Sequence, residues 1–451
     1  MKLFRFRGGV HPEAHKIPSA VKPIEDLPLP RRLYIPLQQH IGAPAKPEVT
    51  VGQHVFKGQL LAHSQGMISA PVHAPTSGTV LAIGDFTAPH PSGLPVHTIT
   101  LETDGENRWQ DGLLPVDPFK LEPEDIAARV GAAGIVGLGG AAFPAAVKLN
   151  LGRNHRIHTL IINGGECEPY LTCDDRLMRE RAHQVLDGIR IMLRALQTER
   201  ALIAIEDNKP TATAAMNVAC RRHHNVAVAT VPSRYPMGSE KQMIQTVTGR
   251  EVPAGQYSAD IGVVVHNVGT AYAVHRAIRH SKPLVSRIVT VGGGALREAK
   301  NLAVPLGTLV EELLAFCGGF CESPARLLMG GPMMGQVLPH TQVPVIKGTS
   351  GVIALTAREA MAGTVQPCIR CGRCVAVCPC GLMPLEIAAR VRKGDLDGAA
   401  DYGLTDCIGC GSCSYACPSH IPLVQYFNYA KGELATRREA KRKSGETRKL
   451  A

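Results

Sequence analysis

The sequence CIRCGRCVAVCP at residues 368–379 returns as CIGCGSCSYACP at residues 407–418. Both copies have the spacing C-x2-C-x2-C-x3-C followed by proline. Two-residue gaps place three thiolates around one face of a cubane cluster, and the proline turns the chain away after the fourth cysteine. In two-cluster ferredoxins this fourth cysteine ligates the other cluster. The repeat therefore predicts two [4Fe–4S] clusters.

This crossed arrangement divides eight cysteines between the two clusters. One set is Cys368, Cys371, Cys374 and Cys417, and the other is Cys378, Cys407, Cys410 and Cys413. A pair of zinc sites is the alternative, but zinc sites rarely show this spacing with a following proline. Cys380 has no place in the pattern, and we expect it to be a spectator thiol. The stretch PLEIAARVRKGDLDGAADYG between the copies predicts two helices, as in ferredoxin domains of the helical type.

The cysteine content supports metal binding rather than disulfides. The chain has 451 residues and 14 cysteines, nine of which lie in residues 368–417. The N-terminal stretch MKLFRFRGGVHP lacks the apolar core of a signal peptide. The sequence contains no run of 18 apolar residues free of charges or repeated Gly and Pro, so we expect no membrane-spanning helix. We therefore expect a cytoplasmic chain, and its length predicts two to four domains. Dense cysteine in a reducing compartment indicates metal binding.

The net charge of +11 is spread along the chain apart from the C-terminal tail. Residues 431–451 hold eight Lys or Arg against three Glu. A solvated, disordered tail is the simpler interpretation, and docking to an acidic protein or anionic lipid is the alternative. Because the charge is not gathered with aromatics on one element, we expect no nucleic-acid partner. Diffuse positive charge would also steer an acidic electron carrier to the surface.

The first part of the chain predicts a small β domain. Residues 50–83 alternate apolar and polar residues between turns, as twisted sheets do. Their phrases V-G-x-x-V-x-x-G-Q-x-L-A and A-P-x-S-G-x-V resemble the lipoyl/biotinyl barrel-sandwich fold. Such carrier domains present a lysine at a hairpin tip, but the corresponding tip at Gly66 and Met67 has none. We therefore expect a structural or docking domain.

From Pro123 onward the pattern alternates helices and strands. TLIING at 159–164 and RALIAIED at 200–207 predict strands, and the segment 176–196 predicts an amphipathic helix. This alternation indicates a mainly parallel α/β sheet running to about Ile278. Residues 284–345 resemble a β-grasp module of the soluble-ligand-binding type. Its Cys317 and Cys321 are expected to be buried small residues, with metal ligation as the alternative.

A glycine-rich loop, GLGGAAFP at residues 137–144, is a weak signal by itself. Such loops cradle phosphates through backbone N–H groups, but many are only tight turns. With Lys148 it resembles the G-x-G-G-A-G-F-P segment of the flavin-binding subunit of respiratory complex I. NGGECEPY (163–170), YPMGSEKQ (235–242) and VHNVGTAYAV (265–274) resemble further segments of that family in the same order.

The resemblance implies a binding site for FMN and NADH. It implies that the flavin phosphate and ring are approached by Gly137, Gly139 and Gly140, with Lys148 offsetting phosphate charge. The implied FMN lining is Asn163, Gly165, Glu166, Gly238, Glu240, Asn267 and Thr270. Phe143, Glu168 and Tyr235 would meet NADH, with Glu168 accepting from the carboxamide. Gly165, Ser239 and His266 depart from the family pattern, which bears on the electrostatics of the pocket more than on the fold.

The motifs occur together, and in this order, in one family. The phrase FRGGVHP at residues 6–12, the barrel segment, the glycine-rich loop, GGPMMG at 330–335 and the doubled cysteine motif resemble the C subunits of Rnf-type ion-translocating complexes. The resemblance implies an NADH-linked oxidoreductase subunit, peripheral on the cytoplasmic face of the inner membrane. Its partners would be the other subunits of the complex and ferredoxin or a cluster-bearing subunit. The rivals are a corrinoid reductase, a hydrogenase or formate dehydrogenase diaphorase, and a cluster-only electron carrier.

The expected fold is multidomain α/β and α+β. We expect a barrel-sandwich domain at residues 1–118, an FMN- and NADH-binding α/β domain at 119–282 and a β-grasp domain at 283–350. A helical two-cluster ferredoxin-type domain at 351–430 and the basic tail would follow.

Overall fold

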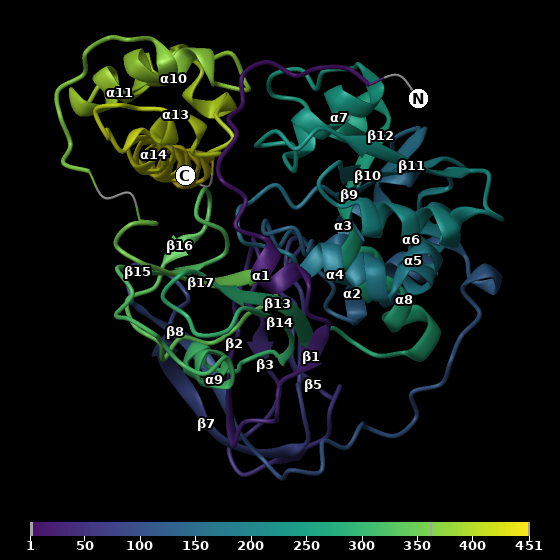
Figure 1. Ribbon diagram of the computed structural model, residues 1–451. Helices are drawn as coiled ribbons and strands as arrows, with labels where there is room; N and C mark the ends of the chain where they lie inside the picture. Colours follow the sequence, from purple (N-terminus) through teal and green to yellow (C-terminus); the bar gives the residue numbers. More distant parts are fainter. Residues whose placement is uncertain (1–2, 361–362, 450–451) are drawn as a thin grey trace. The chain divides into compact units, whose positions relative to one another are not determined.

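The computed structural model describes residues 3–360 and 363–449, with side chains up to residue 440 (Figure 1). Two compact units divide these residues. The first contains residues 13–233 and 257–360, and the second contains residues 3–12, 234–256 and 363–449. The four expected folds are all present.

The first unit begins with a short helix, a strand and the barrel sandwich. Helix α1 (Ile17–Ala20) and strand β1 (Ile24–Asp26) precede it. One antiparallel sheet has the order β2 (Arg32–Pro36), β8 (Pro95–Thr103), β7 (Gly78–Thr87) and β4 (His54–Val55). The other has the order β3 (Lys46–Pro47), β5 (Leu60–His63) and β6 (Val72–His73). Alternate residues such as Leu33, Ile35, Ile99 and Leu101 fill the core between them. Met67 at the tip is 94% exposed.

The α/β domain is built on a four-stranded parallel sheet with the order β11 (Val226–Val231), β10 (Ala201–Glu206), β9 (Thr159–Gly164) and β12 (Val263–Asn267). Alternate residues of β9 and β10, such as Leu160, Ile162 and Ile203, belong to one apolar core with the helices. These helices are α2 (Pro123–Ala132), α3 (Ala145–Leu149), α5 (Ala182–Leu196), α6 (Pro210–Cys220) and α8 (Val268–His280). The predicted parallel sheet is confirmed.

The helix expected at residues 176–196 is instead two helices. Helix α4 spans Cys173–Glu180 and α5 begins at Ala182. Arg181 between them has φ −132° and ψ 27°, outside the helical region. The continuous apolar periodicity concealed this break.

The sheet of the β-grasp domain includes two strands, β1 and β17, that lie outside the expected residues 283–350. This six-stranded sheet has the order β1, β14 (Lys300–Pro305), β13 (Ser286–Gly292), β17 (Gly351–Leu355), β15 (Arg326–Met329) and β16 (Gln336–Val337), with helix α9 (Val310–Phe316). The boundary expected at residue 350 therefore falls just before a central strand. Cys317 is buried in this core, as expected, whereas the expected burial of Cys321 is wrong because it is exposed.

The second unit contains the doubled cysteine motif on short helices. These are α10 (Arg373–Ala376), α11 (Pro384–Arg392), α12 (Leu396–Asp401), α13 (Ser412–Tyr415) and α14 (Leu423–Lys449). The two helices predicted between the motifs are α11 and α12. The expected disordered tail is wrong as far as residue 449, because α14 continues through it. Helix α7 (Glu240–Thr248) belongs to this unit as well.

The first 26 residues contribute to both units. In the second unit, the N–H of Phe4 donates to the carbonyl of Thr246 at 2.9 Å, and that of Gly9 donates to Val377 at 2.8 Å. Gly8, at φ +66°, lies so close that a Cβ there would be 2.5 Å from the carbonyl oxygen of Cys378. In the first unit, residues 14–20 lie against the loop at 166–171, and β1 pairs with β14. A short N-terminal segment therefore takes part in several separate structures.

Candidate redox centres

The structure brings four cysteines from both motif copies around one cavity. Cys378, Cys407, Cys410 and Cys413 line it together with apolar residues such as Ile387, Val424 and Phe427. This is the set that crossed ligation predicts, with the fourth cysteine of the first copy beside three of the second. The N–H of Leu382 points to the sulfur of Cys378, and that of Gly409 to the sulfur of Cys407, each at 3.4 Å.

Around the other predicted centre, Cys374 in α10 has Cys417 and Cys368 as electrostatic neighbours. Burial raises the pKa of the Cys374 thiol, and negative charge on Cys417 and Cys368 raises it further. Cys368 and Cys371 are exposed, whereas Cys378, Cys410 and Cys413 are buried. The first centre therefore lies nearer the protein surface than the second.

The two motif copies follow the same backbone path. Arg370 and Gly409, each between the first two cysteines of its copy, have φ of 53° and 68°. Gly372 and Gly411 follow at 72° and 80°. These left-handed residues curl the chain around a central point, as wrapping a cluster requires.

The donor sets fit iron–sulfur clusters. Burial raises the pKa values of Cys407, Cys410 and Cys413, and neighbouring thiolates raise them further. Four closely spaced thiols in an apolar shell cannot all ionise without compensating metal charge. Cys380 lines the same cavity, and burial raises its pKa to about 12. Its expected role as a spectator thiol stays a prediction.

The flavin prediction concerns a crevice that the strand order creates. Strands β10 and β11 lie on one side of β9, and β12 lies on the other. In open α/β sheets, ligands bind at such a reversal, outside the carboxyl ends of the strands. Asn163 of β9 and Asn267 of β12 lie near these ends. The Nδ2 group of Asn267 donates to the carbonyl of Asn163 at 3.5 Å.

The glycine-rich loop lies at this same edge. Its first residue, Gly137, donates its N–H to the carbonyl of Phe143 at 2.7 Å, and the hydroxyl of Thr270 accepts from the N–H of Leu138 at 2.9 Å. A Cβ on Gly139 would lie 3.3 Å from the Cβ of Asn267, whereas a Cβ on Gly140, at φ +107°, would meet nothing within 4 Å. The loop is therefore tight against α8 on one side and open on the other. This shape fits a flat ring close to the backbone.

The remaining predicted residues of the first unit lie around the crevice. Phe143 ends the loop and is half-buried, and Lys148 in α3 donates to the carbonyl of Val265 at 3.2 Å. The N–H of Gly165 donates to the Asn163 side chain at 2.9 Å. Burial lowers the pKa of His266 to about 3, so this departure from the family pattern is a neutral imidazole.

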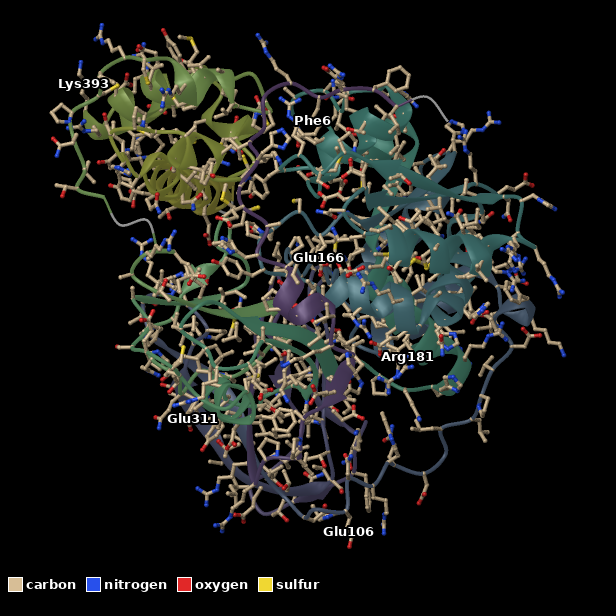
Figure 2. All side chains as sticks on the ribbon, viewed as in Figure 1. Phe6, Glu106, Glu166, Arg181, Glu311 and Lys393 are labelled. Atoms are coloured by element: carbon tan, nitrogen blue, oxygen red, sulfur yellow. The ribbon has the colours of Figure 1, made fainter. Side chains whose placement is uncertain are left out.

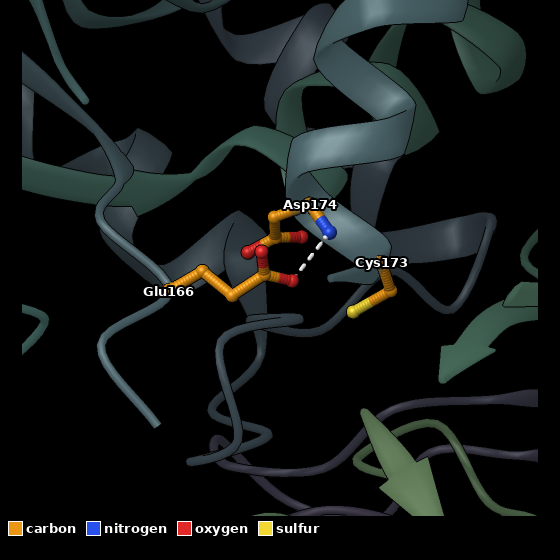
Figure 3. A group of neighbouring side chains, drawn as sticks. All are labelled: Glu166, Cys173 and Asp174. Atoms are coloured by element: carbon orange, nitrogen blue, oxygen red, sulfur yellow. Dashed lines mark hydrogen bonds between the residues drawn. The ribbon is translucent and has the colours of Figure 1, made fainter. Parts of the chain in front are cut away.

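Glu166, Cys173 and Asp174 form a compact group at the crevice (Figure 3). Their ligand atoms lie within 4.8 Å of one another. The carboxylate of Glu166, whose φ is 48°, accepts from the N–H groups of Asp174 at 2.7 Å and Asp175 at 3.2 Å, at the start of α4. Asn267 donates to Asp174 at 2.6 Å. Sequence reasoning missed Asp174, although its place beside Glu166 follows from the helix start.

Because Asp174 lies beside Glu166, we expect its carboxyl to make a pH-dependent contribution to the free energy of unfolding. Burial, and then the charge of Glu166, raise the pKa of Asp174 from 3.8 to about 7. The folded state therefore binds a proton more tightly than the unfolded state between these values, and this contribution falls as pH rises from about 4 to 7. We expect Asp174→Asn to flatten the dependence of the unfolding free energy on pH in this interval. Chemical denaturation at several pH values checks this, and an unchanged slope would contradict it.

Two lysines, also missed from the sequence, hold the loop that carries Glu166: Lys209 is buried and Lys16 is half-buried. Lys209 donates to the carbonyl of Gly165 at 2.6 Å and to the carboxylate of Glu206 at 3.0 Å. Lys16 donates to the carbonyls of Glu166, Glu168 and Leu171 at 2.9, 2.8 and 2.6 Å. Glu206 ends strand β10, so a search of the carboxyl ends of the parallel strands could have found this pair.

Other predicted contacts are placed differently. The carboxylate of Glu168 accepts from the N–H of Met333 at 2.9 Å, in the GGPMMG segment. Tyr235, Gly238 and Glu240 belong to the second unit. Tyr235 is buried, and its hydroxyl donates to the carbonyl of Cys410 at 2.6 Å. The structure thus associates Tyr235 with the cysteine motif, and a role toward NADH stays a prediction.

Four family models match successive parts of the chain. An RnfC barrel sandwich hybrid domain matches residues 4–106 and a Nuo51 FMN-binding domain matches residues 130–276. An SLBB domain matches residues 288–337 and a 4Fe-4S dicluster domain matches residues 367–421. Among curated proteins, the C subunit of the ion-translocating oxidoreductase complex of Rhodobacter capsulatus is 55% identical over 442 residues, or 98% of this chain and 85% of that protein.

The chain belongs to this family of C subunits. Another member, the C subunit of the proton-translocating ferredoxin:NAD(+) oxidoreductase complex of Clostridium ljungdahlii, is 44% identical over 96% of this chain and 94% of its own length. The member from Pseudomonas aeruginosa is 48% identical over 99% of this chain, which spans 58% of its length. The expected family is therefore confirmed, as are FMN and two [4Fe–4S] clusters as cofactors.

A solved structure supports the fold of this family member. An NAD+-reducing [NiFe]-hydrogenase in the H2-reduced state matches with a TM-score of 0.50 and 17% identity, over 72% of this chain and 67% of that chain. In the part of the chain that the structure describes, no helix is both long and apolar enough to cross a bilayer.

Proposed function

We propose that this chain is the NADH-linked subunit of a membrane-bound complex that couples electron transfer between NAD(H) and ferredoxin to ion translocation. The observation that carries the proposal is that one chain holds both a flavin-type crevice and two four-cysteine sets. Its relatives named as C subunits of such complexes match it along nearly its whole length. Its partners would be the other subunits of the complex and ferredoxin or a cluster-bearing subunit.

When bound, FMN exchanges a hydride with NADH and single electrons with iron–sulfur clusters, and so joins two-electron to one-electron chemistry. The chain's own residues would position it. Gly137, Gly139 and Gly140 let the backbone approach, and Lys148 offsets phosphate charge. Asn163, Asn267 and Thr270 would fix the orientation from the ends of β9 and β12 and the first turn of α8.

The carboxyls beside the crevice are suited to holding a proton. Burial and the charge of Glu166 raise the pKa of Asp174, so this carboxyl holds a proton at higher pH than an ordinary aspartate does. Glu166 is held in place by two backbone N–H groups, while Asp174 accepts from Asn267. We assign to this pair the exchange of the proton that accompanies hydride chemistry.

The two crossed cysteine sets are part of this proposal, and the β-grasp domain is extended past residue 350 to include β17. Cys368, Cys371, Cys374 and Cys417 would hold the cluster nearer the surface, which suits exchange with an external electron partner. Cys378, Cys407, Cys410 and Cys413 would hold the buried cluster. We further propose that the chain docks on the cytoplasmic face of the inner membrane through the membrane subunits of the complex.

Anaerobic titration with NADH tests this function. We expect the purified, reconstituted holoprotein to contain FMN and about eight irons per chain. NADH should bleach the flavin absorbance, and EPR signals of reduced clusters should follow. If the protein has its full iron content but contains no flavin and is not reduced by NADH, a cluster-only electron carrier is favoured instead.

A further inference from the structure

A cavity of about 470 Å³ lies inside the first unit. Helices α4 and α8, strands β1, β13 and β14, and the barrel residues Lys57 and Asn107 border it. Its size is typical of small-molecule sites. None of the fourteen residues predicted for FMN or NADH lines it. Figure 2 labels Arg181, which lies on its border at the end of α4.

Five cations border this cavity: Lys57, Arg181, Arg276, Lys282 and Arg287. Within the described residues, none of them lies within 4.0 Å of a carboxylate. The buried Arg287 donates to the carbonyls of Thr349 and Leu138, at 3.1 and 3.0 Å. Lys57 donates to the neutral amide of Asn107, at 2.9 Å. Of the two acids on the border, Asp174 accepts from Asn267 and lies near the charge of Arg287, and Asp26 acts on Lys57 through its charge.

These cations influence one another. Burial, and then the charges of Arg276 and Lys282, lower the pKa of Lys57 to about 8. Two other lysines of this unit have polar partners: the half-buried Lys16 donates to three carbonyls, and the buried Lys209 donates to the carboxylate of Glu206. Lys57, Arg276 and Lys282 are half-buried, whereas Arg181 is exposed. Half-buried like charges without such partners are unfavourable, and an anion between them would remove this cost.

Much of the remaining wall is apolar or aromatic. Leu177, Tyr272 and Ile288 face the cavity. Beside it, Lys57 and Lys282 lie over the ring of Trp109, with their Nζ atoms 5.1 and 5.0 Å from its centroid. A ligand that satisfies both parts of the wall needs a multiply charged anionic head and an apolar body.

We propose that this cavity binds an organic phosphate ester, with its phosphate among Lys57, Arg276 and Lys282 and its apolar part against Leu177, Tyr272 and Ile288. Such a ligand would contact barrel, α/β and β-grasp domains at once. Its site would adjoin the flavin crevice at Asp174 but use none of the residues predicted to hold the flavin or NADH.

Calorimetric titration of the holoprotein in saturating NAD+ tests this site, with phenyl phosphate and inorganic phosphate as probes. We expect one phenyl phosphate per chain, bound at least about tenfold more tightly than inorganic phosphate because the ring adds apolar contact. Arg276→Gln and Lys282→Gln should each weaken it at least about tenfold, since each removes a charge-assisted contact. The fluorescence of Trp109, the single tryptophan of the chain, should change on binding.

Arg222→Gln is the matched control, because Arg222 is an exposed arginine of the same unit that does not border the cavity. It should bind phenyl phosphate like the wild type, and all three variants should keep NADH-dependent flavin reduction. The proposal is overturned if phenyl phosphate does not bind, if it binds no better than inorganic phosphate, or if binding is unchanged in both cavity variants. Binding of phenyl phosphate that occurs without NAD+ but disappears in saturating NAD+ would likewise assign it to the nucleotide site.

Discussion

Replacing Cys371 by alanine should remove one of the two iron–sulfur clusters, lowering the iron content from about eight to about four per chain. Cys371 belongs to the set proposed for the cluster nearer the surface. The other set, Cys378, Cys407, Cys410 and Cys413, keeps all four thiolates. NADH should still reduce the flavin, because the crevice residues of the first unit are untouched. Iron analysis, EPR of the dithionite-reduced protein and NADH titration measure the three effects.

Cys380→Ala is the matched control for this change. Cys380 lies beside the buried set but outside the repeated spacing, and both EPR signals should survive its loss. Loss of a signal in this variant would show that Cys380 is a ligand. Loss of flavin reduction in a correctly folded Cys371→Ala protein would contradict the separation between crevice and clusters.

The crossed assignment can be tested in the same experiment. Cys374→Ala and Cys417→Ala should abolish the same EPR signal although they lie in different motif copies. Cys378→Ala and Cys410→Ala should abolish the other one. If Cys378→Ala removed the signal that Cys374→Ala removes, each motif copy would hold its own cluster and the assignment would be wrong.

Replacing Lys209 by methionine should lower the stability of the first unit by ~3–5 kcal/mol, the usual cost of leaving a buried charge without its partner. Lys209 and Glu206 are 1% and 2% exposed. Burial opposes the charge on Lys209, but Glu206 and Glu166 outweigh it and raise its pKa. The variant would leave Glu206 and the carbonyl of Gly165 unsatisfied. Chemical denaturation followed by circular dichroism measures the loss.

The double variant Lys209→Met with Glu206→Gln separates charge from packing. Because it leaves no unpaired carboxylate, it should recover part of the stability that the single variant loses. Equal losses in the two proteins would mean that the hydrogen bond to Gly165, rather than the ion pair, dominates. We also expect weaker FMN binding in the single variant, because Lys209 fixes the loop that follows Asn163 and carries Glu166.

Local spacing made the cysteine sets and the parallel sheet predictable. Each copy of the cysteine motif is only twelve residues long. The strands of the sheet are short apolar runs with helices between them. Long-range pairings left no such signal. Strand β1 joins a sheet whose other strands begin more than 250 residues later, and Lys16 meets the loop at 166–171 only in the folded chain. The interaction of Lys209 with Gly165 likewise depends on which strands are neighbours.

The helical tail shows the opposite error. Its charge density suggested disorder, but Glu433 precedes Arg437 by four residues, a spacing that supports a helix. The helix also begins within the ferredoxin-type core, where Leu423, Phe427 and Leu434 are buried. A helix already nucleated by packing extends at little cost.

The dispersed contacts of the first 26 residues have a consequence for biosynthesis. This segment leaves the ribosome first, yet Gly9 and β1 find their partners only after residues 377 and 301 have been made. Contacts so distant in sequence slow folding, and the waiting segment is exposed while the chain is completed. An affinity tag or truncation at this end should therefore reduce the yield of folded protein more than the same change after residue 449.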